Sequence, residues 1–116
     1  MFKLFAKKDK KPKATFRGPQ YIYRPMENAL SYRVEHRDSV RYVYPGWSKS
    51  FLFKIEEGKI YRAGEDEPYY IIIGKGIYEP DGEKLVYKLM SDAIYRSNSR
   101  EPEFVIKNSI NVQGTI

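Results

Sequence analysis

The stretch Ile77-Tyr78-Glu79-Pro80-Asp81-Gly82-Glu83-Lys84-Leu85-Val86-Tyr87-Lys88-Leu89 contains the pattern from which the fold can be predicted. An Ile-Tyr pair opens it, a Pro-Asp-Gly segment follows, and Leu85, Tyr87 and Leu89 then occupy every second position. Pro, Asp and Gly are turn formers, and a period of two is typical of a half-buried strand. The stretch therefore predicts a β-hairpin.

The same pattern occurs five times along the chain. The copies start 21 residues apart once and then 17 residues apart three times, and the extra four residues fall between Glu35 and Tyr42. The first positions are Ile22, Val43, Ile60, Ile77 and Ile94, and the second positions are Tyr23, Tyr44, Tyr61, Tyr78 and Tyr95. The eleventh positions are Tyr32, Phe53, Tyr70, Tyr87 and Phe104, and the thirteenth are Val34, Ile55, Ile72, Leu89 and Ile106. An internal repeat of this kind indicates a repetitive architecture.

Five tandem hairpins predict an all-β fold. A single hairpin is marginally stable in water, so the copies are expected to bury a shared apolar face against one another. They can do so side by side or by closing into a compact radial ring, and closure also removes free sheet edges. A strand around Ile110 and Val112, paired with the segment near Phe16, would complete such a ring. No window has helical periodicity with caps, so no long helix is expected.

The order of Ile-Tyr, a turn with Gly, and an aromatic-x-aliphatic strand resembles the four-fold β-flower type of bacterial β-hairpin-repeat domain. The resemblance covers residues 20–112 and is carried most clearly by residues 77–89. It implies a compact radial arrangement of hairpins, in a family with no established activity. This chain has five copies where that family has four. A linear stack of hairpins, as in cell-wall-binding aromatic repeats, is the alternative architecture.

The charge divides the chain into two parts. The 116 residues carry a formal net charge of +6. Residues 1–18 hold seven Lys and Arg against one Asp, whereas residues 19–116 hold 14 residues of each sign. We therefore predict a basic flexible arm over residues 1–18 and a β-hairpin-repeat domain over residues 19–116. The candidate binding residues of the arm are Lys7, Lys8, Lys10, Lys11, Lys13 and Arg17.

The arm has two interpretations. It is either a solvated terminus that keeps a neutral domain soluble or a docking segment for nucleic acid, an anionic membrane surface or an acidic protein. Lysines that neutralise phosphates release counterions, so nucleic-acid binding would weaken with salt. The apolar residues Phe2, Leu4 and Phe5 would suit a lipid interface. This apolar start is too short for a signal peptide, and we expect a cytoplasmic protein.

Composition excludes several kinds of site. The chain has no Cys and a single His, His36, which excludes disulfides, thiolate chemistry and most His-based metal clusters. No nucleophile is recognisable near His36, and we expect it to be a surface residue of a polar link. Glu65-Asp66-Glu67 lacks the alternating spacing of a calcium loop, and Gly74-Lys75-Gly76 is only a fragment of a phosphate loop. We predict no catalytic residue, no metal and no cofactor.

Two kinds of aromatic residue are candidate binding groups. The second-position tyrosines would gather their phenols in a radial fold, but a residue that recurs in every copy is also expected for core packing. Trp47 lies in the turn Pro45-Gly46-Trp47. It is either an exposed interaction residue or it packs over the neighbouring hairpin.

These observations favour a non-enzymatic binding or assembly module with a basic docking arm. A protein partner or self-association is the expected interaction. Nucleic-acid binding is the first alternative, in which the arm would act with exposed tyrosines and with Arg24, Arg33, Arg62 or Arg96. An enzyme of unrecognised type is the second alternative.

Overall fold

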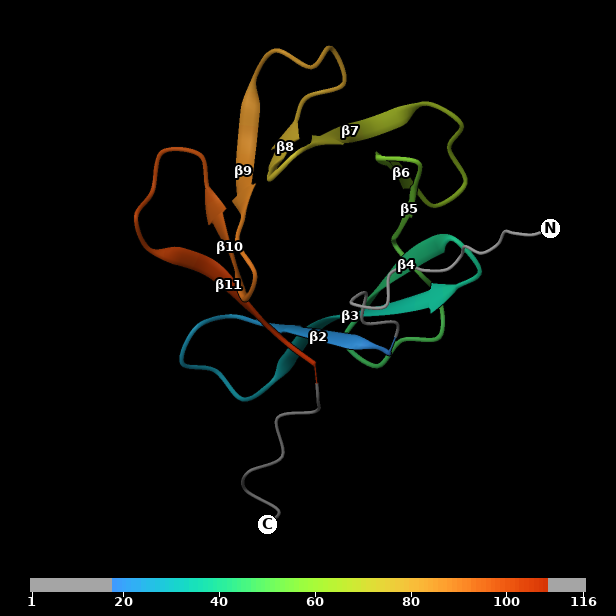
Figure 1. Ribbon diagram of the computed structural model, residues 1–116. Helices are drawn as coiled ribbons and strands as arrows, with labels where there is room; N and C mark the ends of the chain where they lie inside the picture. Colours follow the sequence, from blue (N-terminus) through green and yellow to red (C-terminus); the bar gives the residue numbers. More distant parts are fainter. Residues whose placement is uncertain (1–17, 109–116) are drawn as a thin grey trace, which may run out of the picture.

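A computed structural model describes residues 18–108 of the protein, which form ten β-strands and no helix (Figure 1). The strands are β2 (Gln20–Tyr23), β3 (Leu30–Arg37), β4 (Val40–Pro45), β5 (Phe53–Glu56), β6 (Lys59–Arg62), β7 (Pro68–Ile73), β8 (Gly76–Tyr78), β9 (Leu85–Leu89), β10 (Ala93–Arg96) and β11 (Pro102–Lys107). Each strand pairs antiparallel with its neighbours in the chain, and β11 pairs with β2, so the sheet closes as a barrel. The predicted all-β fold of tandem hairpins is confirmed, and its arrangement is closed rather than linear.

The register of the strands follows the sequence repeat. Within each hairpin the first-position residue lies opposite the eleventh-position residue, as Ile22 lies opposite Tyr32. The thirteenth-position residue lies opposite the first-position residue of the next copy, as Val34 lies opposite Val43. The last pair of this kind, Ile106 with Ile22, joins the fifth copy to the first. Equivalent residues of the five copies therefore make equivalent pairs all the way around the barrel.

The hairpins change direction directly after their first-position residues. In four of the five hairpins the register shifts between this residue and the tyrosine that follows it. Such a bulge bends the strand and turns the side chains that come after it. Figure 1 shows the result: the hairpin loops radiate outward from the central ring of strands.

The four residues that interrupt the repeat spacing lengthen two strands. We expected a polar link here, but β3 and β4 stay paired as far as Arg37 opposite Val40. The turn between them contains Asp38 with a φ of 57°, a conformation that Asp adopts more readily than most residues. His36, expected in a link, lies in β3 opposite Arg41. The expectation was wrong because the charged residues at 35–38 and 41 hide the period-two pattern of a strand, although β3 and β4 pair across this segment.

The strands β11 and β2 close the barrel by pairing with each other. Residues 105–107 of β11 pair with residues 21–23 of β2. The expected partners, Ile110, Val112 and Phe16, lie outside the described residues. Within the described residues, the fifth copy is joined to the first through its own thirteenth-position residue, Ile106, which lies opposite Ile22 of β2.

Gly76 lies at a position where the barrel has no space for a side chain. It is buried, and a Cβ atom there would lie 2.7 Å from Cε1 of Tyr78 and 2.7 Å from Cδ1 of Leu85. The tyrosine ring would have to move, so Gly76→Ala should lower the free energy of unfolding by about 1–3 kcal/mol. Urea denaturation followed by circular dichroism measures this change.

Gly64→Asn is the control for that substitution. No atom lies within 4 Å of a Cβ at Gly64, and Asn tolerates the positive φ of this residue. We expect little change in the unfolding midpoint. Equal midpoints for wild type and Gly76→Ala would contradict the packing around β8.

Candidate functional site

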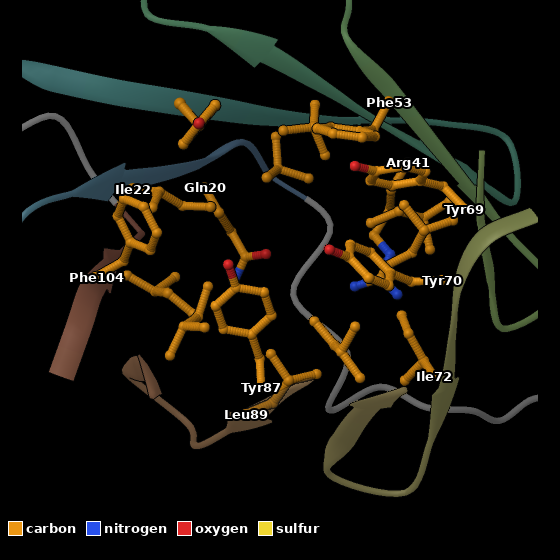
Figure 2. Close-up of a pocket in the computed structure, with 18 of the residues that line it drawn as sticks. Gln20, Ile22, Arg41, Phe53, Tyr69, Tyr70, Ile72, Tyr87, Leu89 and Phe104 are labelled. Atoms are coloured by element: carbon orange, nitrogen blue, oxygen red, sulfur yellow. The ribbon is translucent and has the colours of Figure 1, made fainter. Parts of the chain in front are cut away.

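A cavity of about 560 Å³ lies inside the barrel. Its volume falls within the range of about 300–1,000 Å³ that is usual for small-molecule sites. Fifteen of the lining residues are the first-, eleventh- and thirteenth-position residues of the five copies. The other four are Gln20, Arg41, Tyr69 and Gly74. Figure 2 shows these side chains converging on one space from strands all around the ring.

The inward-facing side chains do not fill this interior. Barrels of about eight strands are just wide enough to be filled by side chains or to hold one small ligand, and this barrel has ten strands. Among the fifteen repeat residues that line the cavity, only Ile22, Val34 and Ile60 are buried. The five eleventh-position aromatics stay half-buried. The interior is therefore an apolar surface that remains accessible.

The second-position tyrosines do not line the cavity. Successive residues of a strand point to opposite faces of the sheet, so a first-position residue that points inward directs its neighbour away. Tyr23 and Tyr44 are among the most buried residues, with 2% and 5% of their surface exposed. The hydroxyl of Tyr44 accepts a hydrogen bond from Nη2 of Arg37 at 2.7 Å, and the Arg33 guanidinium lies 4.3 Å from the centre of its ring. These tyrosines contribute to packing outside the cavity.

Polar residues break the five-fold symmetry of the cavity. Gln20 and Arg41 each stand two residues before a first-position residue, on the same face of their strand. The corresponding residues of the other three copies, Gly58, Lys75 and Asp92, lie in the turns between strands. Strand β4 begins at Val40, within the lengthened β3–β4 hairpin. The irregular spacing of the repeat therefore places Arg41 in the barrel wall.

Arg41 is the one charged residue among the described residues that line the cavity. In the part of the chain that the structure describes, the ion pairs involve other cations and none includes Arg41. Burial lowers the pKa of Arg41, because a cation is less stable away from water. A guanidinium nevertheless stays protonated at neutral pH. The described lining of the cavity thus combines mainly apolar side chains with a single positive charge.

Four tyrosines supply hydroxyl groups to the cavity: Tyr32, Tyr69, Tyr70 and Tyr87. The ring of Tyr70 lies between two others, with its centre 4.6 Å from that of Tyr69 and 6.5 Å from that of Tyr87. Burial raises the pKa of Tyr70, and the neighbouring Tyr69 and Tyr87 raise it further. At neutral pH its hydroxyl is therefore protonated and can donate a hydrogen bond. Figure 2 shows Arg41, Tyr70 and Tyr87 directed into the same space.

Sequence reasoning did not identify this site. The eleventh-position aromatics were recognised as part of the repeat, but nothing in a single copy shows whether they meet in a core or line an opening. Arg41 belongs to no motif. The signal that was present is the 21-residue spacing, because a site is expected where one copy differs from the others.

Trp47 is exposed and also packs against the neighbouring hairpin. Its side chain is 60% exposed. Its ring centre lies 6.1 Å from that of Tyr21 in β2, and the Arg33 guanidinium lies 5.7 Å from the Trp47 ring centre. Trp47 therefore packs against the neighbouring hairpin while much of its surface faces solvent.

The arginines that we considered for nucleic-acid binding each lie beside a carboxylate. The pairs are Arg24 with Glu103, Arg33 with Glu35, Arg62 with Glu65, and Arg96 with Glu103, at 2.7–3.9 Å. The pairs of Arg24, Arg62 and Arg96 are on exposed arginines and contribute little to stability, whereas Arg33 is largely buried. In each of the four pairs the carboxylate offsets the charge of its arginine. The arm residues Lys7, Lys8, Lys10, Lys11, Lys13 and Arg17 lie outside the described residues.

The remaining candidates from the sequence do not form sites in the described part of the chain. Residues 65–67 are exposed, and no group of three His, Asp or Glu side chains within residues 18–108 is placed to hold a metal ion. Residues 74 and 75 form the turn between β7 and β8, and no helix follows them. Gly74 borders the cavity.

No protein-family model matches the chain, and comparisons with curated proteins and with solved structures found no match. The resemblance to the β-flower type therefore stays a prediction. Within residues 18–108 there is no helix with the length and apolar character needed to cross a membrane.

The raised pKa of Tyr70 makes stability depend on pH in the alkaline range. Its proton is held more tightly in the folded protein than in the unfolded chain, whose tyrosines ionise near pH 10. Stability should therefore fall as the pH rises above about 10. Tyr70→Phe removes this contribution, so its urea midpoint should fall less between about pH 8 and pH 10.5 than that of wild type. Tyr61→Phe, outside the cavity, is the control; equal effects of the two substitutions would contradict the burial of Tyr70.

Proposed function

We propose that this protein is a non-enzymatic binding module whose ligand site is the cavity inside the barrel. The observation that carries the proposal is the accessible apolar interior of about 560 Å³. Apolar surface in contact with water is unfavourable, so a ligand that covers it gains free energy from burial. Apolar walls with a few placed polar groups are also the usual composition of a small-molecule site.

The chemistry of the cavity supports binding over catalysis. Its described lining contains one guanidinium, one amide and four phenols, together with apolar side chains and a glycine. General acid–base catalysis and nucleophilic catalysis most often use His, carboxylates, Lys, Ser or Cys, and these residue types are missing from that lining. The groups that are present can hold and orient a ligand.

Binding of an uncharged fluorescent probe tests the proposal. N-phenyl-1-naphthylamine, whose emission rises in apolar surroundings, should bind the full-length protein with a stoichiometry of one. Ile72 lines the cavity, whereas the next residue of β7, Ile73, is 52% exposed and points away. Ile72→Trp takes up cavity space and should weaken probe binding by about tenfold or more, whereas Ile73→Trp should leave it unchanged.

Circular dichroism of both variants shows whether the barrel is retained. The proposal is wrong if the wild-type protein does not bind the probe, or if the two substitutions weaken binding equally.

We also propose that the arm, residues 1–18, docks onto an anionic partner. Nucleic acid is the first partner to test, since nucleic-acid binding is the alternative function of this protein. The support is the separation of charge: the arm carries +6, and residues 19–116 carry equal numbers of both signs. The ion pairs of the barrel arginines add to this contrast. An electrostatic partner would therefore depend on the arm more than on the barrel.

Titration with a labelled single-stranded oligonucleotide at two salt concentrations tests the arm. Wild-type binding should weaken as salt increases, because each neutralised phosphate releases a counterion. Replacing Lys7, Lys8, Lys10, Lys11 and Lys13 with Gln in the full chain should reduce both the affinity and its salt dependence. If these substitutions do not change the affinity for the oligonucleotide, the arm is not the segment that binds it.

A further inference from the structure

We propose that the cavity selects small molecules with one anionic head group, a carboxylate or sulfonate, on an apolar body, and that Arg41 binds the head group. The inference rests on the proposed function of the cavity as a ligand site. It adds the chemical class of the ligand and the residue that determines the selectivity.

The position of Arg41 directs its charge into the cavity. It lies in β4 opposite His36 of β3 and Ile55 of β5, so strands flank it on both sides. Two residues separate it from Val43, which also lines the cavity, and residues two apart in a strand share a face. In Figure 2 its side chain extends among those of Phe53, Tyr69 and Tyr70.

Within residues 18–108, no carboxylate is paired with Arg41. No carboxylate is among the described lining residues of the cavity either. A partly desolvated cation without an anion is unfavourable. The exposed arginines Arg24, Arg62 and Arg96 do have carboxylate partners. An anionic ligand would supply the partner that Arg41 does not have among the described residues.

The rest of the lining defines the other end of the ligand. Ten aliphatic and five aromatic residues from the repeat surround the space, so the ligand's body is apolar. One guanidinium matches one anionic head, because a second charge would be buried without a partner. A planar guanidinium can also donate two hydrogen bonds to a carboxylate or sulfonate. The hydroxyl of Tyr70 also lies at this space.

The arm of this chain is the other candidate occupant, because it contains Phe2, Leu4 and Phe5. Its charge argues against it. Seven basic residues accompany those apolar side chains within residues 1–18, and like charges repel. Charge complementarity with Arg41 therefore favours a separate anionic molecule.

Two probes that differ in a single group test the selectivity on the full-length protein. 8-Anilinonaphthalene-1-sulfonate is N-phenyl-1-naphthylamine with an added sulfonate. We expect the sulfonate to bind about tenfold more tightly than the uncharged probe, because hydrogen bonds to charged groups are the stronger ones. Arg41→Gln should weaken sulfonate binding by about tenfold or more, and should weaken binding of the uncharged probe by clearly less.

Arg100→Gln is the matched control. It removes the same charge from an exposed residue in the loop between β10 and β11, so both affinities should be unchanged. Arg41→Lys keeps the charge but not the planar pair of donors, and should retain part of the preference for the sulfonate. It also provides a second measurement if Arg41→Gln does not fold.

The outcomes separate the inference from the function on which it rests. If neither probe binds, the proposed function and the inference are both wrong. If the uncharged probe binds as tightly as the sulfonate, or if Arg100→Gln weakens sulfonate binding as much as Arg41→Gln, only the anion selectivity is wrong. Replacement of Phe2 and Phe5 by Ser gives a further test, because a rise in affinity for both probes would identify the arm as the occupant and overturn the proposal.

Discussion

The pairing of β11 with β2 is the contact on which the rest of the barrel depends. It places Ile106 opposite Ile22 and joins residues from the two ends of the repeat. Without it, the hairpins would form an open sheet with two unpaired edges, and individual hairpins are only marginally stable. Because this contact joins the fifth copy to the first, the interior is surrounded by five copies. A linear stack would set no such limit.

A barrel closed by ten strands has an interior that the inward-facing side chains do not fill. The positions that carry the repeat point inward, yet the aromatic residues among them remain half-buried. The closest packing lies elsewhere: Tyr23 and Tyr44, on the other face of their strands, are among the most buried residues. The barrel therefore combines a wall held by backbone pairing and outer packing with an interior that the side chains leave partly unfilled.

The first two copies of the repeat are 21 residues apart, whereas the other copies are 17 residues apart. Four extra residues between the first two copies lengthen β3 and β4, and Arg41 lies in the lengthened part. A requirement of the fold recurs in every copy, whereas this charge occurs once. Repetition of the fold therefore does not explain Arg41, and the proposed anion selectivity rests on this residue.

The sequence by itself determined the hairpins, their number and the residues that share a face. This information is local: a period of two identifies a strand, and turn formers such as Pro80 and Gly82 separate one strand from the next. The closure of the ring through β11 and β2 is seen only in the three-dimensional structure. The same is true of the inward direction of the first-position residues, in contrast to the tyrosines beside them. The structure also showed that the interior stays open and that Arg41 faces it. The physical reason is that the inward face and its spare volume depend on how many strands close the barrel and where bulges turn them, and neither can be read from any one copy of the repeat.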